Sequence, residues 1–76
     1  MTKKEFLEEL ASILKEDPEA VTPEAKLESF AGWDSLGLLG AVALLDGDLG
    51  VTIDVDKLRA CVTPQDLMNL AEGKLQ

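Results

Sequence analysis

The sequence lacks histidine and tyrosine, and its 76 residues include only one cysteine, one tryptophan and two phenylalanines. Without histidine there is no usual general base for a nucleophilic serine, which argues against a hydrolase of the Ser-His type. The one cysteine, Cys61, cannot form a disulfide within the chain, and this favours a reducing compartment. We therefore expect a cytoplasmic protein.

Basic residues and long apolar runs are also scarce. Seven lysines and arginines stand against fifteen acids, and the resulting net charge of −8 disfavours nucleic acid and anionic lipid as partners. The longest uncharged run, Ser35 to Leu45, is too short to span a bilayer. The N-terminus, MTKKEFLEEL, is charged and amphipathic, unlike a signal peptide. We expect a soluble protein that does not insert into membranes.

The length predicts a single domain, residues 1–76, near the size at which one core is just sufficient. A first helix is expected after Thr2, which has capping-box spacing with Glu5. Apolar residues then recur at helical spacing: Phe6, Leu10, Ile13 and Leu14. Pro18 is expected to stop this helix.

Residues 17–34 predict a long loop, which Pro18 and Pro23 interrupt. Loops of this length in small domains are usually functional or disordered. Three apolar residues spaced along the loop indicate anchors on the core: Val21, Leu27 and Phe30. We therefore expect this loop to be ordered.

The second helix is predicted from Asp34 or Ser35 to about Asp48. One apolar stripe is expected to face the core: Leu38, Val42, Leu45 and Leu49. Roughly opposite lies a stripe without bulk or charge: Gly37, Gly40, Ala43 and Gly47. Because glycine inside a helix costs about 1 kcal/mol relative to alanine, we expect this small stripe to have a compensating role.

Gly50 is expected to end the second helix. Residues 51–56, VTIDVD, alternate as in a strand, but an isolated strand has no partner, so we expect extended chain and then a short helix at about 56–60. The last helix is predicted to start at Thr63-Pro64, a cap followed by proline at the first helical position. Its apolar face is expected to include Leu67, Leu70 and Ala71. The sequence therefore predicts an all-α fold, a small four-helix bundle of three main helices and one short one, with a long loop between helices 1 and 2.

Several residues invite a chemical interpretation. Ser35 could simply cap the second helix, a common role for serine, and no G-x-S-x-G elbow surrounds it. Cys61 is expected to act as a small hydrophobic residue, and Trp33 as a packing anchor. Residues 46–57 begin like a calcium loop, but Val51 replaces the required glycine and Lys57 the closing glutamate, so no metal site is predicted.

The segment from Phe30 to Leu36, F-A-G-W-D-S-L, resembles the phosphopantetheine attachment motif of acyl carrier proteins, whose core is Asp-Ser-Leu at the start of the second helix. Further segments match the family in order along the chain: K-E-D-P-E-A-V-T-P from Lys15, the apolar helix after the serine, V-T-I-D from Val51, Thr63-Pro64, and D-L-M-N-L in the last helix. The chain is therefore similar to this family over essentially the whole domain.

The resemblance implies that Ser35 receives 4′-phosphopantetheine from coenzyme A through a separate phosphopantetheinyl transferase, with Asp34 and Leu36 as flanking recognition residues. Such a serine needs no base of its own, because the transferase supplies the chemistry. A phosphodiester there would also lie at a helix N-terminus, where unpaired amides favour an anion. The implied protein has no catalytic residues: it is a stand-alone, monomeric acyl carrier, loaded by an acyl ligase or acyltransferase and serving synthase-type enzymes of fatty-acid, polyketide or related specialised biosynthesis.

The second helix departs from the family pattern, because Gly37 and Gly40 stand where carriers of primary fatty-acid synthesis typically have acids. A specialised pathway is therefore favoured over primary fatty-acid synthesis. The predicted partner interface comprises Trp33, Gly37, Gly40, Ala43, Asp46 and Gly47. Three alternatives stay open: tolerated drift to glycine on an exposed face, an aminoacyl or peptidyl carrier, and an interaction module of the same fold that carries nothing.

Overall fold

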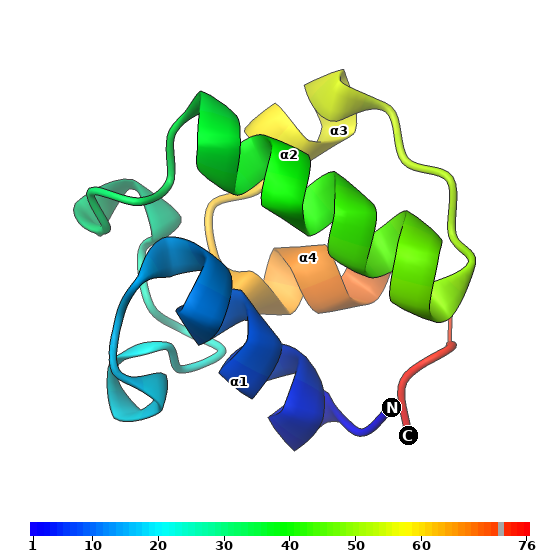
Figure 1. Cartoon of the computed structure of the whole chain (residues 1–76), viewed down its shortest axis with the longest axis horizontal. Coiled ribbons are helices and arrows are strands. Elements are labelled where there is room, and N and C mark those ends of the chain that lie inside the picture. The colour runs from blue at the N-terminus through cyan, green and yellow to red at the C-terminus, as the bar shows by residue number, and fades with distance from the viewer. Residues whose placement is uncertain (72) are drawn as a thin grey trace.

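A computed structural model describes residues 1–71 and 73–76, and within them the chain forms helices and loops but no strand. The α-helices are α1 (Lys3–Leu14), α2 (Ser35–Ala43), α3 (Val55–Arg59) and α4 (Pro64–Leu70). Figure 1 shows α2 crossing the molecule with α1 and α3 packed on it, and the two chain ends side by side. The all-α class, with three longer helices and one short one, is confirmed.

The predicted capping box of α1 is present. The backbone N–H of Glu5 donates to the Thr2 hydroxyl at 3.1 Å, and the Thr2 N–H donates to the Glu5 carboxylate at 2.9 Å. The end of α1 was predicted wrongly, because the helix stops at Leu14 and not at Pro18. Lys15 adopts the left-handed conformation at φ 59°. The N–H of Glu16 donates a hydrogen bond to the Ala11 carbonyl at 2.9 Å. This is the pattern of a Schellman motif, which closes the helix.

The loop from residue 17 to 34 is anchored as predicted. Val21, Leu27 and Phe30 are all buried in the core. The loop contains two 3-10 turns, Pro18–Ala20 and Leu27–Ser29. Backbone bonds from Leu27 N–H to the Val62 carbonyl, at 2.9 Å, and from Gln65 N–H to the Pro23 carbonyl, at 3.1 Å, tie it to the chain around the start of α4. The loop therefore leads into α2 from a fixed position.

The face of α2 that enters the core differs from the prediction. Of the predicted stripe only Leu45 is fully buried, while the other three members are half-buried: Leu38, Val42 and Leu49. The buried residues are instead Gly37, Ala41, Leu44 and Leu45. The inward face is thus rotated toward the small residues, and beyond Ala43 the helix widens into a π-helical segment, Leu44–Asp48.

The preceding loop and α1 approach this face of α2 closely. A Cβ on Gly37 would collide with the carbonyl oxygen of Gly32, and one on Gly40 would lie 2.6 Å from Cγ2 of Ile13. The missing side chains thus let α2 pack tightly on α1 and on the loop before it. The prediction that Gly37 and Gly40 lie opposite the core is wrong.

The C-terminal part of the chain follows the prediction closely. Gly50, at φ 70°, ends the second helix, and its N–H donates to the Asp46 carbonyl at 3.0 Å. Extended chain leads to α3, which begins one residue before its predicted start. The cap of α4 is Thr63, with Pro64 in the first turn. Its inner face comprises Leu67, Met68 and Ala71, with Leu70 half-buried.

Candidate functional site: an exposed serine at the start of α2

Ser35 is the first residue of α2, and its side chain is exposed. The helix is capped by its neighbour Asp34, whose Oδ1 accepts hydrogen bonds from the N–H groups of Leu36 at 3.0 Å and Gly37 at 3.1 Å. Among the residues that the structure describes, the Ser35 hydroxyl takes part in no hydrogen bond. The interpretation of Ser35 as a simple cap is therefore wrong, and its hydroxyl is free to react.

The Asp34 cap also corrects one electrostatic expectation. Unpaired amides at this helix start were expected to favour an anion on Ser35, but the Asp34 carboxylate already accepts hydrogen bonds from two of them, the N–H groups of Leu36 and Gly37. The start of α2 therefore holds a fixed negative charge beside the serine. An anion attached to Ser35 would be repelled by this carboxylate, and a nearby positive group would reduce the repulsion.

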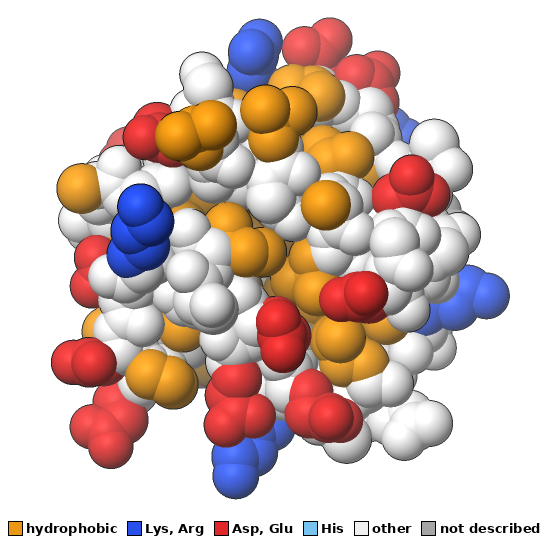
Figure 2. Space-filling model, viewed as in Figure 1, with side chains coloured by type: hydrophobic (Ala, Val, Ile, Leu, Met, Phe, Trp, Pro, Cys, Tyr) orange, Lys and Arg blue, Asp and Glu red, His pale blue; other side chains and the backbone are white. Residues whose placement is uncertain are grey.

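Large apolar side chains surround the serine on the outside of α2. Leu36 and Leu39 are 76 % and 61 % exposed, the two largest values among the exposed large hydrophobic residues. In Figure 2, hydrophobic side chains gather on the surface over α2 and α3, and acidic side chains lie along the lower edge of this view. Leu36 and Leu39 lie one helical turn apart, so together they place exposed apolar surface beside Ser35.

A shallow depression connects Ser35 to α3. It is lined by Ser35, Leu38 and Leu39 from α2, and by Val55 and Arg59 from α3. Sequence analysis did not single out Arg59, although Arg59 is the only arginine of the chain. The packing of α3 on α2 brings Arg59 to the depression that contains the serine.

The residues predicted to form a partner interface separate into two groups. Ala43, Asp46 and Gly47 are exposed along the second helix, as expected of a free surface. Gly37 is buried, and the space beside Gly40 is filled by Ile13. Gly37 therefore serves the internal packing of α2, while Gly40 is half-buried beside α1 and lines a surface depression together with Ala43.

Trp33 and Cys61 both line a second depression, together with Glu28, Arg59, Ala60 and Val62. Trp33 is half-buried and packs against the core, which fits a packing anchor, and its backbone N–H donates to the Phe30 carbonyl at 3.0 Å. The Cys61 thiol donates to the Lys57 carbonyl at 3.4 Å. Burial raises the pKa of this thiol, with a smaller contribution from Asp66, so Cys61 holds little reactive thiolate.

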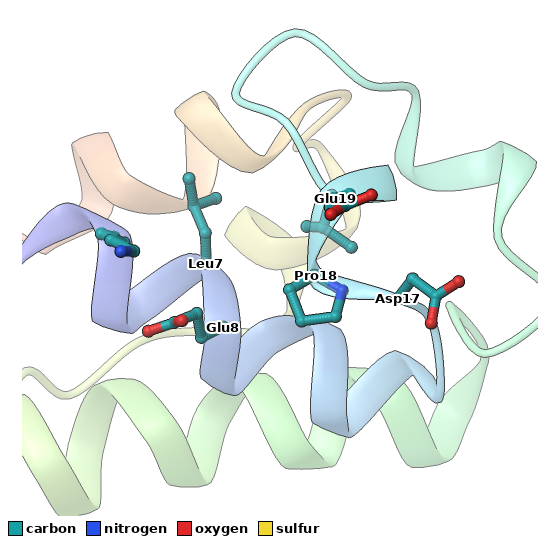
Figure 3. Close-up of a pocket in the computed structure, with 7 residues that line it drawn as sticks. Leu7, Glu8, Asp17, Pro18 and Glu19 are labelled. Atoms are coloured by element: carbon teal, nitrogen blue, oxygen red, sulfur yellow. The ribbon is translucent and has the colours of Figure 1, made fainter.

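A groove larger than the depression beside Ser35 lies away from the serine, between α1 and the turn that follows it. Figure 3 shows Leu7 and Glu8 of α1 facing this groove, and Asp17, Pro18 and Glu19 on its other wall. No residue of α2 lines this groove.

The class of protein now follows from the fold and the site. A small helical domain presents an exposed serine and exposed leucines at the start of one helix, and the helix is capped by the neighbouring aspartate. The model of the phosphopantetheine attachment site family matches residues 4–71. Because the match covers most of the chain, the chain belongs to this family. It is a phosphopantetheine-bearing carrier domain, which is non-catalytic.

Membership of the family implies a 4′-phosphopantetheine prosthetic group, a phosphopantetheinyl transferase that attaches it, and partner enzymes that use it. No curated protein and no solved structure gives a significant match to the chain. Within the described residues, no helix has the length and apolar character needed to cross a membrane.

Proposed function

We propose that Ser35 carries the 4′-phosphopantetheine group and that the domain delivers acyl groups, as thioesters, to the enzymes of a specialised biosynthetic pathway. The observation that carries this proposal is the exposed Ser35 hydroxyl, which is released from capping by Asp34. A transferase can reach this oxygen without unfolding any part of the helix.

The residues around Ser35 are compatible with an attached 4′-phosphopantetheine group. When bound, the group supplies a terminal thiol, on a long arm, that holds an acyl chain as a thioester. Ser35 contributes the oxygen of attachment at the rim of α2, where the arm is free to reach a partner's active site. Leu38 and Leu39 line the depression beside it and offer apolar contact to the arm. Tethering then presents the acyl group to a docked enzyme at high effective concentration.

Partner enzymes are proposed to dock on the outward face of α2. Its centre is formed by Leu36 and Leu39, the two strongly exposed leucines next to the attachment oxygen. Ala43, Asp46 and Gly47 extend this face toward the end of the helix, and Trp33 borders it before the helix starts. An interface of this kind buries an apolar centre and keeps charge at its rim.

The net negative charge of the domain supports basic partner enzymes, and such acidity is more typical of acyl carriers than of aminoacyl carriers. The net charge of −8 creates a negative field that attracts enzymes with basic docking surfaces and accelerates their encounter. Four exposed aspartates follow or border the outward face: Asp46, Asp48, Asp54 and Asp56. An aminoacyl or peptidyl cargo is the alternative, and only the loading enzyme distinguishes the two.

Incubation with coenzyme A and a broad-specificity phosphopantetheinyl transferase tests the proposal. We expect the intact mass of the wild-type protein to rise by one 4′-phosphopantetheine group and that of Ser35→Ala to stay unchanged. Ser12→Ala is the matched control, because Ser12 is an exposed serine on α1 and its loss leaves modification intact. Absence of a mass gain in the wild type, or a gain that persists in Ser35→Ala, contradicts the proposal.

A further inference from the structure

The Asp34 carboxylate places a negative charge next to Ser35, the residue proposed to carry a phosphodiester. The Asp34 carboxylate accepts hydrogen bonds from the N–H groups of Leu36 and Gly37, so these two N–H groups are not free to bind a phosphate. A phosphodiester on Ser35 therefore adds a second negative charge directly beside the first, in a chain whose net charge is already −8. A nearby cation would remove much of this repulsion.

Arg59 is the cation that the fold supplies. It is the last residue of α3, and Figure 1 shows this end of α3 beside the first half of α2. The Arg59 side chain lines the same depression as Ser35. Lys57, in the same helix, lines neither this depression nor the one beside Trp33. Of the two basic residues of α3, only Arg59 is therefore positioned toward the serine.

The chemistry of arginine suits this position. The guanidinium is planar, and two of its N–H groups can donate in parallel to two oxygens of one phosphate. Its long aliphatic stem can lie along apolar neighbours while the charged end reaches out, and Leu39 and Val55 line the same depression. An exposed arginine can also adjust its rotamers to an oxygen that stands at the rim.

We propose that Arg59 is the phosphate-binding residue of the domain: its guanidinium donates hydrogen bonds to the phosphodiester attached to Ser35. This inference rests on the proposed function, because it presupposes attachment at Ser35. The bond holds the base of the arm against α3, so the arm leaves the domain on the α3 side of α2. It also balances the negative charge that Asp34 imposes on the site.

Nuclear magnetic resonance of the modified protein tests this role without any partner enzyme. Wild type, Arg59→Gln, Arg59→Lys and the control Lys57→Gln are each converted with the transferase and checked by intact mass. We expect the Arg59 Nε–Hε resonance of the wild type to shift on modification. The phosphorus resonance of Arg59→Gln is expected to move from the wild-type position, with Arg59→Lys between them and Lys57→Gln unchanged. At about 1 M salt, where the Debye length is about 3 Å, the wild-type phosphorus resonance is expected to move toward that of Arg59→Gln.

The possible failures are distinguishable. If the wild type gains the mass of the group but the Arg59 resonance does not move and all four phosphorus resonances coincide, the role of Arg59 is wrong while attachment stands. If the wild type gains no mass, the proposed function is wrong and the role of Arg59 falls with it. Amide spectra of the unmodified variants identify any loss of fold, and Arg59→Lys provides the second, more conservative test.

Discussion

The two faces of α2 use their residues in opposite ways. The inward face carries Gly37 and Ala41, whose small size lets α1 and the preceding loop approach closely. The outward face carries Leu36 and Leu39, which are left largely exposed. Over the first two turns of this helix, small residues mark the packed side, and large apolar residues mark the side that another protein is proposed to cover. Side-chain size alone therefore does not indicate which face is buried.

The largest effect on stability is expected from Gly37→Ala. The added Cβ collides with the backbone carbonyl of Gly32, which cannot move aside as a side chain could. Overpacking of this kind costs about 1–3 kcal/mol, and we expect the loss at the upper end of this range to outweigh the gain in helix propensity. Urea unfolding of the unmodified protein measures it.

Gly40→Ala is a second test of the packing on the inward face of α2. Its Cβ would meet Cγ2 of Ile13, a side-chain atom that can shift, so we expect a smaller loss of stability than for Gly37→Ala. If both variants are as stable as the wild type, the close packing of α1 on α2 is wrong and these glycines do not belong to the inward face.

Leu39→Gln tests the outward face. Leu39 is 61 % exposed, so we expect the free energy of unfolding to change by no more than about 0.5 kcal/mol. The rate constant kcat/KM for modification by the transferase is expected to fall by about tenfold, because the substitution removes an apolar contact at the centre of the docking face.

The matched control is Val62→Gln, since Val62 is also exposed, at 48 %, but lies in the segment before α4. It should leave kcat/KM near the wild-type value. Equal rates for Leu39→Gln and the wild type would mean that the transferase docks elsewhere.

Gly47→Ala is expected to have the opposite sign from Gly37→Ala. No atom lies within 4 Å of a Cβ built on Gly47, and the residue is exposed within the π-helical segment. Alanine should therefore stabilise the protein by up to about 1 kcal/mol through helix propensity. A destabilised variant, measured by the same urea unfolding, would show that this end of the helix is packed against something.

The smallest effect on stability is expected at the start of α4, away from the two faces of α2. It comes from the Asp66 carboxylate and depends on pH. The backbone N–H groups of Val62 and Thr63 donate to the Asp66 carboxylate at 2.9 Å and 3.2 Å and lower the pKa of Asp66. A lowered folded-state pKa stabilises the fold above the unfolded-state value, about 3.9, and this contribution is lost as the pH falls through the folded-state pKa.

We therefore expect Asp66→Asn to be less stable than the wild type at pH 7, with the gap closing below about pH 3.9. Asp17→Asn is the control, because the Asp17 side chain makes no capping bond. A gap for Asp66→Asn that stays constant across this range would contradict the role of the charged carboxylate.

Local signals in the sequence were sufficient to predict where most helices start. Capping is decided within four residues, which is why the starts at Thr2 and Thr63 are confirmed. At the start of α2 two good capping residues stand together, and only the structure distinguishes Asp34 as the cap from Ser35 as the free hydroxyl. The end of α1 could not be predicted, because it depends on a left-handed lysine, Lys15, a conformation that lysine rarely adopts.

The tertiary features of the site were beyond a single sequence. Helical periodicity reveals two stripes on α2, but it does not tell which one faces α1 when glycine permits close approach. Arg59 is far from Ser35 in sequence, and the packing of α3 on α2 alone brings the two together. The motif around the serine, by contrast, is local, and it was sufficient to suggest the family to which the chain belongs.

Peptide mapping of the modified protein tests the central claim most directly. Cleavage after lysine and arginine releases residues 27–57, a peptide that contains both Ser29 and Ser35. Fragmentation in the mass spectrometer then assigns the added group to one residue. We predict a single phosphopantetheine on Ser35 and an unmodified Ser29. Assignment of the group to Ser29, or to any residue outside this peptide, would contradict the account.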